Sequence, residues 1–99
     1  MSAFEELEEE FSEIVKLMPE GPDFDSHDFT LKLAQRYQQF YVRALNEYAS
    51  NDQPFQSVHK EIAKRLKKRT DLVVQNGTRY SEDIFGRRNK VAVWRKVKK

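Results

Sequence analysis

Residues 54–69 read PFQSVHKEIAKRLKKR and predict one amphipathic helix. Pro54 suits the first helical turn, because its missing N–H would have no partner there in any case. The apolar residues recur at helical spacing and predict one buried stripe: Phe55, Val58, Ile62 and Leu66. Basic residues fill the rest of the helix: Lys60, Lys64, Arg65, Lys67, Lys68 and Arg69. The chain is therefore expected to carry a strongly basic helix, with one face on the core and the other open to a partner.

Two further helices are expected before the basic one. Residues 3–18 place apolar side chains at spacings of three and four, within an acidic sequence. This helix is expected either to lie across its own domain or to pair with a second copy. Residues 19–27, PEGPDFDSH, predict a loop. Residues 28–49 carry a wide aromatic face and predict the helix at the centre of the core.

The period of the pattern changes after residue 70. The apolar run at 72–74 predicts a strand, Asn76-Gly77 predicts a tight turn, and 78–80 would return as its partner. Residues 81–86 predict a capped single turn, and 90–97 alternate as a final strand. The expected fold is α+β: three helices followed by a small antiparallel β-hairpin or sheet. This order resembles that of a winged helix, in which a recognition helix precedes a hairpin.

The predicted core combines aromatic and aliphatic side chains from all of these segments. It comprises Phe11, Ile14, Leu33, Tyr37, Phe40, Leu45, Phe55, Val58, Ile62, Leu66, Val73, Phe85 and Trp94. Residues 1–27 are expected as an acidic helix and loop, and residues 28–99 as the helical core with its basic helix and hairpin.

The charge is divided unevenly along the 99 residues. Residues 1–28 hold ten acidic residues and one basic residue, which gives −9, and residues 29–99 hold 17 Lys and Arg against six Asp and Glu, which gives +11. A division of this kind indicates either internal pairing or a polyanionic partner for the basic part. The absence of cysteine removes disulfides and thiolate chemistry. The acidic start has neither the basic nor the apolar region of a signal peptide, so an intracellular protein without a membrane span is expected.

No catalytic or metal-binding pattern emerges from the two histidines. His27 stands in the capping region of a helix, and His59 stands at the edge of the apolar stripe. His27 stands near Asp23, Asp25 and Asp28, which resemble a loose metal cluster, but capping sequences use the same residues and no second His lies at a ligand spacing. No glycine-rich loop for a phosphate-bearing cofactor is present. A protein that is not an enzyme, with no cofactor and no metal, is expected.

A small nucleic-acid-binding module, acting as a DNA binder or an accessory regulator, is the function that the pattern favours. Cations attract phosphates through counterion release, and DNA is expected more than RNA. The expected phosphate contacts are Lys60, Lys64, Lys67, Lys68, Arg69, Arg87, Arg88 and Lys90. The alternative is a protein-interaction or scaffolding domain that docks on a partner, or dimerises, through residues 3–18 or the aromatic helix.

Overall fold

The computed structural model describes residues 3–19 and 23–97, which form an α+β fold. Its helices are α1 (Ala3–Glu9), α2 (Phe11–Leu17), α3 (Ser26–Arg36), α4 (Gln38–Glu47) and α5 (Pro54–Lys68). Its strands are β1 (Phe24–Asp25), β2 (Val73–Glu82) and β3 (Arg88–Lys96). The α+β class is confirmed, and the expected count of three helices is corrected to five in the described residues.

Both of the first two expected helices are interrupted once. The helix predicted over 3–18 breaks at Glu10, and the one predicted over 28–49 breaks at Tyr37, whose φ and ψ are −125° and 58°. The breaks let each half pack on a different neighbour: α1 lies mainly on α4, and α2 lies on α3. Neither break falls at proline or glycine, so no local residue pattern predicts them.

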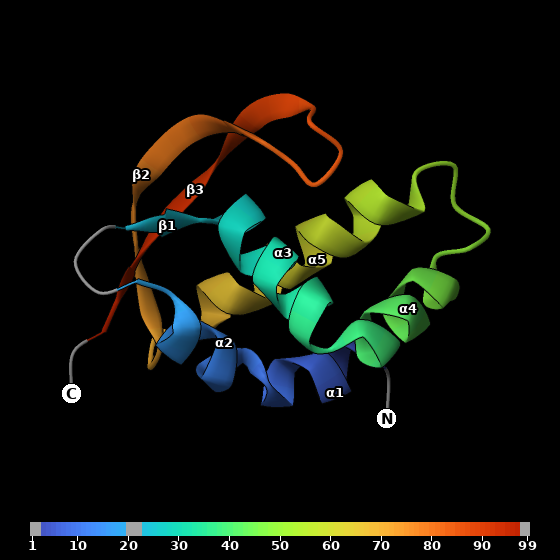
Figure 1. Ribbon diagram of the computed structural model, residues 1–99, viewed down its shortest axis with the longest axis horizontal. Helices are drawn as coiled ribbons and strands as arrows, with labels where there is room; N and C mark the ends of the chain where they lie inside the picture. Colours follow the sequence, from blue (N-terminus) through green and yellow to red (C-terminus); the bar gives the residue numbers. More distant parts are fainter. Residues whose placement is uncertain (1–2, 20–22, 98–99) are drawn as a thin grey trace.

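The three strands form one antiparallel sheet with the order β1-β3-β2. β1 lies inside the segment predicted as a loop and pairs Phe24 with Trp94. Figure 1 shows α3 beside this sheet, with the hairpin of β2 and β3 curving over α3 and α5. The short strand therefore connects the start of the chain's helical core to the middle strand of the sheet.

The prediction of a tight turn at Asn76-Gly77 is wrong. β2 continues through these residues, with a shift of register between Gln75 and Thr78. Gly77 has φ +89°, a value that a bulge can require as well as a turn. The hairpin turns instead after Asp83, whose carboxylate accepts hydrogen bonds from the backbone N–H groups of Phe85 (2.9 Å) and Arg87 (3.0 Å).

One core unites both parts of the chain. The side chains of Leu7, Phe11 and Ile14 are fully buried in the same cluster as Phe29 and Trp94. Phe11 meets Phe29 edge to face at 5.0 Å between ring centroids. The apolar stripe of α1 and α2 is thus covered by its own domain.

Two residues expected in the core lie at the surface. Phe55 is 39% exposed and Phe85 is 57% exposed, and their rings contact each other at 4.8 Å. This contact attaches the hairpin loop to the first turn of α5. In the described residues, no helix has the length and apolar content needed to cross a membrane.

Candidate nucleic-acid interface

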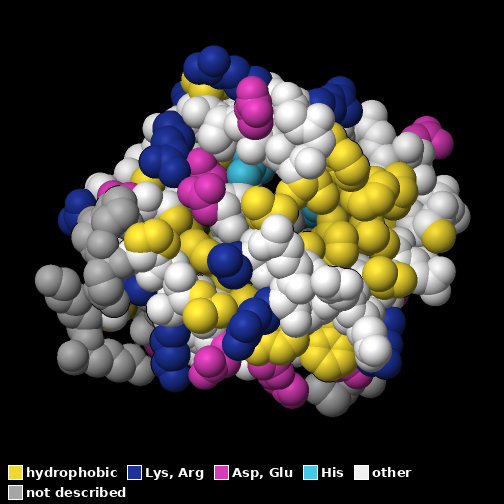
Figure 2. Space-filling view, viewed as in Figure 1, with side chains coloured by type: hydrophobic (Ala, Val, Ile, Leu, Met, Phe, Trp, Pro, Cys, Tyr) yellow, Lys and Arg dark blue, Asp and Glu magenta, His cyan; other side chains and the backbone are white. Residues whose placement is uncertain are grey.

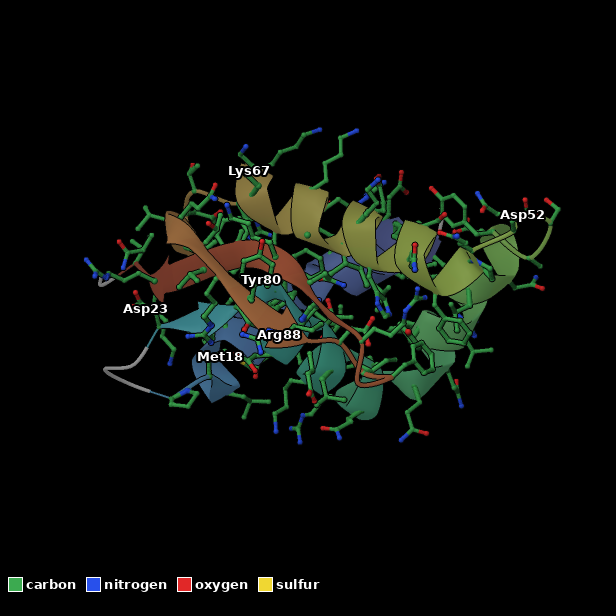
Figure 3. All side chains as sticks on the ribbon, turned by 90° about the horizontal axis from the view of Figure 1, so that it is seen from above. Met18, Asp23, Asp52, Lys67, Tyr80 and Arg88 are labelled. Atoms are coloured by element: carbon green, nitrogen blue, oxygen red, sulfur yellow. The ribbon has the colours of Figure 1, made fainter. Side chains whose placement is uncertain are left out.

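The outer face of α5 presents a row of lysines. Val58, Ile62 and Leu66 turn the opposite face into the core, with at most 1% of each side chain exposed. The helical period then places Lys60, Lys64, Lys67 and Lys68 in solvent, where all four are exposed. Figure 3 shows Lys67 on the side of α5 that points away from the hairpin. The structure therefore brings the four predicted lysines onto one continuous surface.

The hairpin supplies a second group of cations. Arg87, Arg88 and Lys90 are exposed around its turn. The guanidinium of Arg88 lies 5.9 Å from the centre of the Tyr80 ring, which is itself 62% exposed. Figure 3 shows both side chains on the outside of the hairpin. An exposed aromatic ring beside a guanidinium is a combination that suits stacking on a nucleobase.

Arg69 differs from the other predicted contacts. Its guanidinium forms two hydrogen bonds with the carboxylate of Asp71, at 2.9 and 3.0 Å, and a third with the carbonyl oxygen of Glu8 at 3.4 Å. The hydrogen bond with Asp71 and the nearby carboxylates raise the pKa of Arg69, although partial burial opposes them. Arg69 therefore joins the end of α5 to α1, apart from the lysine row.

Other arginines are paired in the same way. Arg65 contacts the carboxylates of Glu61 (3.2 Å) and Glu8 (3.7 Å), and Arg79 contacts those of Asp25 and Asp28. By contrast, Lys60, Lys64, Lys67, Lys68, Arg87 and Lys90 form no ion pair with any residue in 3–19 or 23–97. The outer face of α5 and the turn of the hairpin therefore gather most of the cations that have no ion pair in the described residues, and Lys32 and Arg36 of α3 are further ones.

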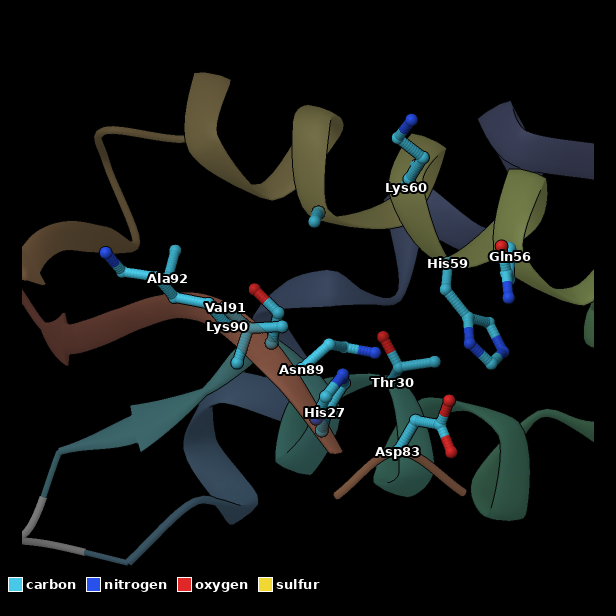
Figure 4. A pocket seen from close by; sticks show the side chains of 12 residues that line it. His27, Thr30, Gln56, His59, Lys60, Asp83, Asn89, Lys90, Val91 and Ala92 are labelled. Atoms are coloured by element: carbon cyan, nitrogen blue, oxygen red, sulfur yellow. The ribbon is translucent and has the colours of Figure 1, made fainter. Parts of the chain in front are cut away.

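A pocket of about 400 Å³ lies between α3, α5 and the hairpin. Figure 4 shows the ring of His59 projecting into it above Asp83, with Thr30 and Asn89 alongside. In Figure 2, histidine surface is visible at the bottom of a hollow beside a cluster of apolar side chains. The sequence suggested no such pocket, because its walls come from residues up to 66 positions apart.

Hydrogen bonds fix both histidines of this pocket. The Nδ1 atom of His27 lies 2.7 Å from the Ser81 hydroxyl, and the Nε2 atom of His59 lies 2.6 Å from the Tyr41 hydroxyl. Burial raises the pKa of Tyr41 to about 12, so this hydroxyl keeps its proton at neutral pH. Burial lowers the pKa of His59, with the charge of Asp83 opposing the shift. We assign Tyr41 as the donor, which places the proton of the neutral imidazole on Nδ1.

The histidines do not form a metal site with their neighbours. Within the part of the chain that the structure describes, no three His, Asp or Glu side chains are grouped as metal ligands. The Asp83 carboxylate is engaged by the backbone of its own turn. These hydrogen bonds lower its pKa although burial acts against them, so it is ionised at neutral pH.

Comparisons with protein-family models, with curated proteins and with solved structures found no match to this chain. Its function therefore has to be inferred from the chemistry of its own surfaces.

Proposed function

We propose that the protein is a winged-helix-like nucleic-acid-binding module, with duplex DNA as its favoured ligand. The observation that carries the proposal is the separation of cations described above. Arginines beside acidic residues are paired internally, whereas the lysines of α5 and the cations of the hairpin face solvent without acidic partners in the described residues. A surface of this kind attracts phosphates, because each contact releases counterions from DNA.

The order of the elements supports the winged-helix part of the proposal. A winged helix has a helix, a short strand, two helices and a hairpin, with the short strand beside the second strand of the hairpin. Here β1 follows α2 and pairs with β3, and α5 stands directly before the hairpin. One departure is that α3 and α4 together replace one helix. A second is that residues 48–53 form a longer connection to α5 than a helix-turn-helix motif has.

In this proposal α5 lies against the major groove, and Lys60, Lys64, Lys67 and Lys68 contact the phosphates on its sides. Arg87, Arg88 and Lys90 reach the neighbouring backbone from the hairpin. Phosphate contacts position a protein without reading sequence, so the affinity is mainly electrostatic. A protein of this function would lie inside the cell, where it meets nucleic acid.

The test is fluorescence anisotropy of a labelled DNA duplex at about 50 and 200 mM salt, because six to ten phosphate contacts lose on the order of 10³-fold or more in affinity over this range. The same sequence as duplex and single-stranded RNA compares the two nucleic acids. Failure of the protein to bind any of these probes at the lower salt would refute the proposal.

A double substitution then locates the contact surface. Lys64→Glu with Lys68→Glu is expected to weaken duplex binding at least about 100-fold, since two contacts become repulsions. The matched control is Lys16→Glu with Arg36→Glu, which changes the net charge equally at exposed positions away from α5. Equal loss in both variants would mean that net charge, and not the α5 surface, determines binding.

A protein-interaction domain is the second candidate, and one observation favours it. Phe55 and Phe85 leave an exposed aromatic pair where the hairpin meets α5. The stripe of α1 and α2, in contrast, is buried in its own core, so a dimer through it would first have to expose Leu7 and Phe11. Size-exclusion chromatography with light scattering on the full chain, and on Phe85→Ser, tests self-association through the aromatic pair.

A further inference from the structure

The pocket has one cation from each of the two groups on its rim. Lys60 belongs both to the lysine row of α5 and to the rim of the pocket, and Lys90 belongs to the hairpin and to the same rim. A polyanion that contacts both Lys60 and Lys90 lies at the mouth of the pocket. Its position thus connects the pocket to the proposed nucleic-acid surface.

The interior of the pocket combines an apolar wall with polar groups of both kinds. Ala63 from α5 and Val91 and Ala92 from β3 form the apolar part. A flat, uncharged ring can lie on such a wall without loss of hydrogen bonds. The volume of about 400 Å³ falls within the range of small-molecule sites.

The polar groups suit the edge of a nucleobase. The Asp83 carboxylate is an acceptor for an amino or ring N–H group, and its backbone contacts use one of its two oxygens. His59 has its Nε2 atom on Tyr41, which leaves Nδ1 as a donor toward the pocket. Gln56 and Asn89 each offer a donor and an acceptor. Every base presents both donors and acceptors along its edge.

We propose that this pocket binds one unpaired nucleotide, with its base on the wall of Ala63 and Val91 and its phosphate between Lys60 and Lys90. The inference rests on the proposed nucleic-acid function and names the ligand that the same surface would select. The nucleotide has two sources, an unpaired position in a bound strand and a free mononucleotide. Both present the same base and phosphate.

The first experiment compares two labelled duplexes that differ only in one unpaired nucleotide at the centre. At about 50 mM salt, the duplex with the unpaired nucleotide is expected to bind the wild-type protein about tenfold more tightly, the gain of one or two new hydrogen bonds. Ala63→Met fills the pocket from α5 without altering charge and is expected to abolish the difference. Ala63→Ser, which leaves the pocket open, is the control and is expected to retain it.

A second blocking variant guards against misfolding of the first. Val91→Phe fills the pocket from β3 with a residue that strands favour, and circular dichroism checks both variants. Loss of discrimination in a folded blocking variant, with unchanged binding to the perfect duplex, supports the pocket. Unchanged discrimination in both folded variants overturns it.

The second experiment separates the two sources of the nucleotide. Deoxynucleoside monophosphates are added to the protein, and the imidazole C–H signals of His27 and His59 are followed by NMR. Shifts that saturate and that Ala63→Met abolishes support the pocket with a free nucleotide, even if the two duplexes bind equally.

The failures of the two proposals give different results. Equal, salt-dependent binding of both duplexes together with unshifted imidazole signals overturns the nucleotide pocket and leaves the proposed nucleic-acid function intact. Absence of binding to every strand at low salt refutes that function, and unshifted signals in the same protein then overturn the pocket as well.

Discussion

Lys64 and Arg65 are neighbours in the sequence, yet they belong to two regions of the molecule with different electrostatics. Lys64 stands on the outer face of α5, exposed and without an ion pair among the described residues. Arg65 stands on the side of α5 that faces α1, between the carboxylates of Glu8 and Glu61 and 5.3 Å from the centre of the Phe4 ring. On the inner side of α5, the charge of Arg65 holds this helix to α1. On the outer side, the charge of Lys64 remains available to a ligand.

The types of cation follow this division. A guanidinium is planar and binds carboxylates with two hydrogen bonds, as Arg69 does with Asp71. A lysine ammonium is strongly hydrated and remains in solvent at little cost. The charge division along the sequence therefore has two explanations at once: part of it is internal pairing, and part is an open basic surface.

The largest expected effect comes from reversing each of these two neighbours. Arg65→Glu would place a third carboxylate beside Glu8 and Glu61, and is expected to cost about 2–3 kcal/mol of unfolding free energy. Lys64→Glu is expected to change stability by less than about 0.5 kcal/mol, as is usual at the surface. Urea denaturation measures both.

Fluorescence anisotropy with duplex DNA compares the affinities of the same two variants, and here the larger effect is expected from Lys64→Glu. Lys64→Glu is expected to weaken binding by about tenfold or more at low salt, because one phosphate contact becomes a repulsion. If the two variants lose equal stability and equal affinity, the division of α5 into two regions is incorrect.

The second prediction concerns Asp25, which forms an ion pair with Arg79. The Asp25 side chain caps α3 by accepting from the Asp28 N–H at 2.9 Å and binds the Arg79 guanidinium at 3.0 Å. Asp25→Ala is expected to cost about 2 kcal/mol, the sum of a lost cap and a lost charged hydrogen bond. Asp28→Ala, at the exposed end of the same capping box, is the control with about half that cost.

The pH dependence of this difference gives a separate check. Burial opposes ionisation of Asp25, but hydrogen bonds from Asp28 and Arg79 outweigh it and lower its pKa below the usual 3.8. A lowered carboxylate pKa stabilises the fold above the unfolded value and loses that contribution as the pH falls through the folded one. The gap between wild type and Asp25→Ala should therefore shrink below pH 3.8, and a constant gap would argue against the ionic contribution.

The basic helix could be predicted from the sequence because its signals are local. Pro54 at the start, the spacing of Val58, Ile62 and Leu66, and the lysines between them all depend on neighbours within one or two turns. The breaks at Glu10 and Tyr37 could not be predicted, since they follow from which helix each half packs against. Packing between segments far apart in the sequence determines where the helices break, and the residues near each break carry no sign of it.

The hairpin and the pocket also depend on residues far apart in the sequence, so local patterns could not predict them. Asn76-Gly77 has the composition of a turn, but the strand partners of 73–82 on β3 decide that it is a bulge. The surface position of Phe55 depends on Phe85, 30 residues later. The pocket needs His27, His59 and Asp83 from three separate elements. The expected lysine row required only the period of one helix, which is why it could be placed in advance.

The third prediction tests the bulge that precedes the hairpin cations. Gly77 has φ +89°, and a side chain there would meet no other atom within 4 Å. Gly77→Ala is therefore expected to cost about 1 kcal/mol from backbone strain alone. Because β2 continues beyond the bulge, the amides of 78–82 should remain protected in hydrogen exchange. Loss of their protection would show that strand pairing beyond the bulge depends on Gly77. The placement of the cations at the hairpin turn would then depend on this glycine as well.

The smallest expected effect is that of substituting His59. Its ring packs against Tyr41 of α4, and the charged or titratable groups that act on it are His27 of α3 and Asp83 of the hairpin turn. Burial, aided by His27 and opposed by Asp83, lowers its pKa below 6.5, so the unfolded chain binds more protons as the pH falls through this range. Stability should then decrease from pH 6.5 downward. His59→Gln keeps a hydrogen-bonding group for Tyr41 but cannot titrate, so its stability should vary less between pH 5 and 7, as measured by urea denaturation at each pH. An identical slope in the variant would assign the acid sensitivity to another group and leave His59 as a packing residue.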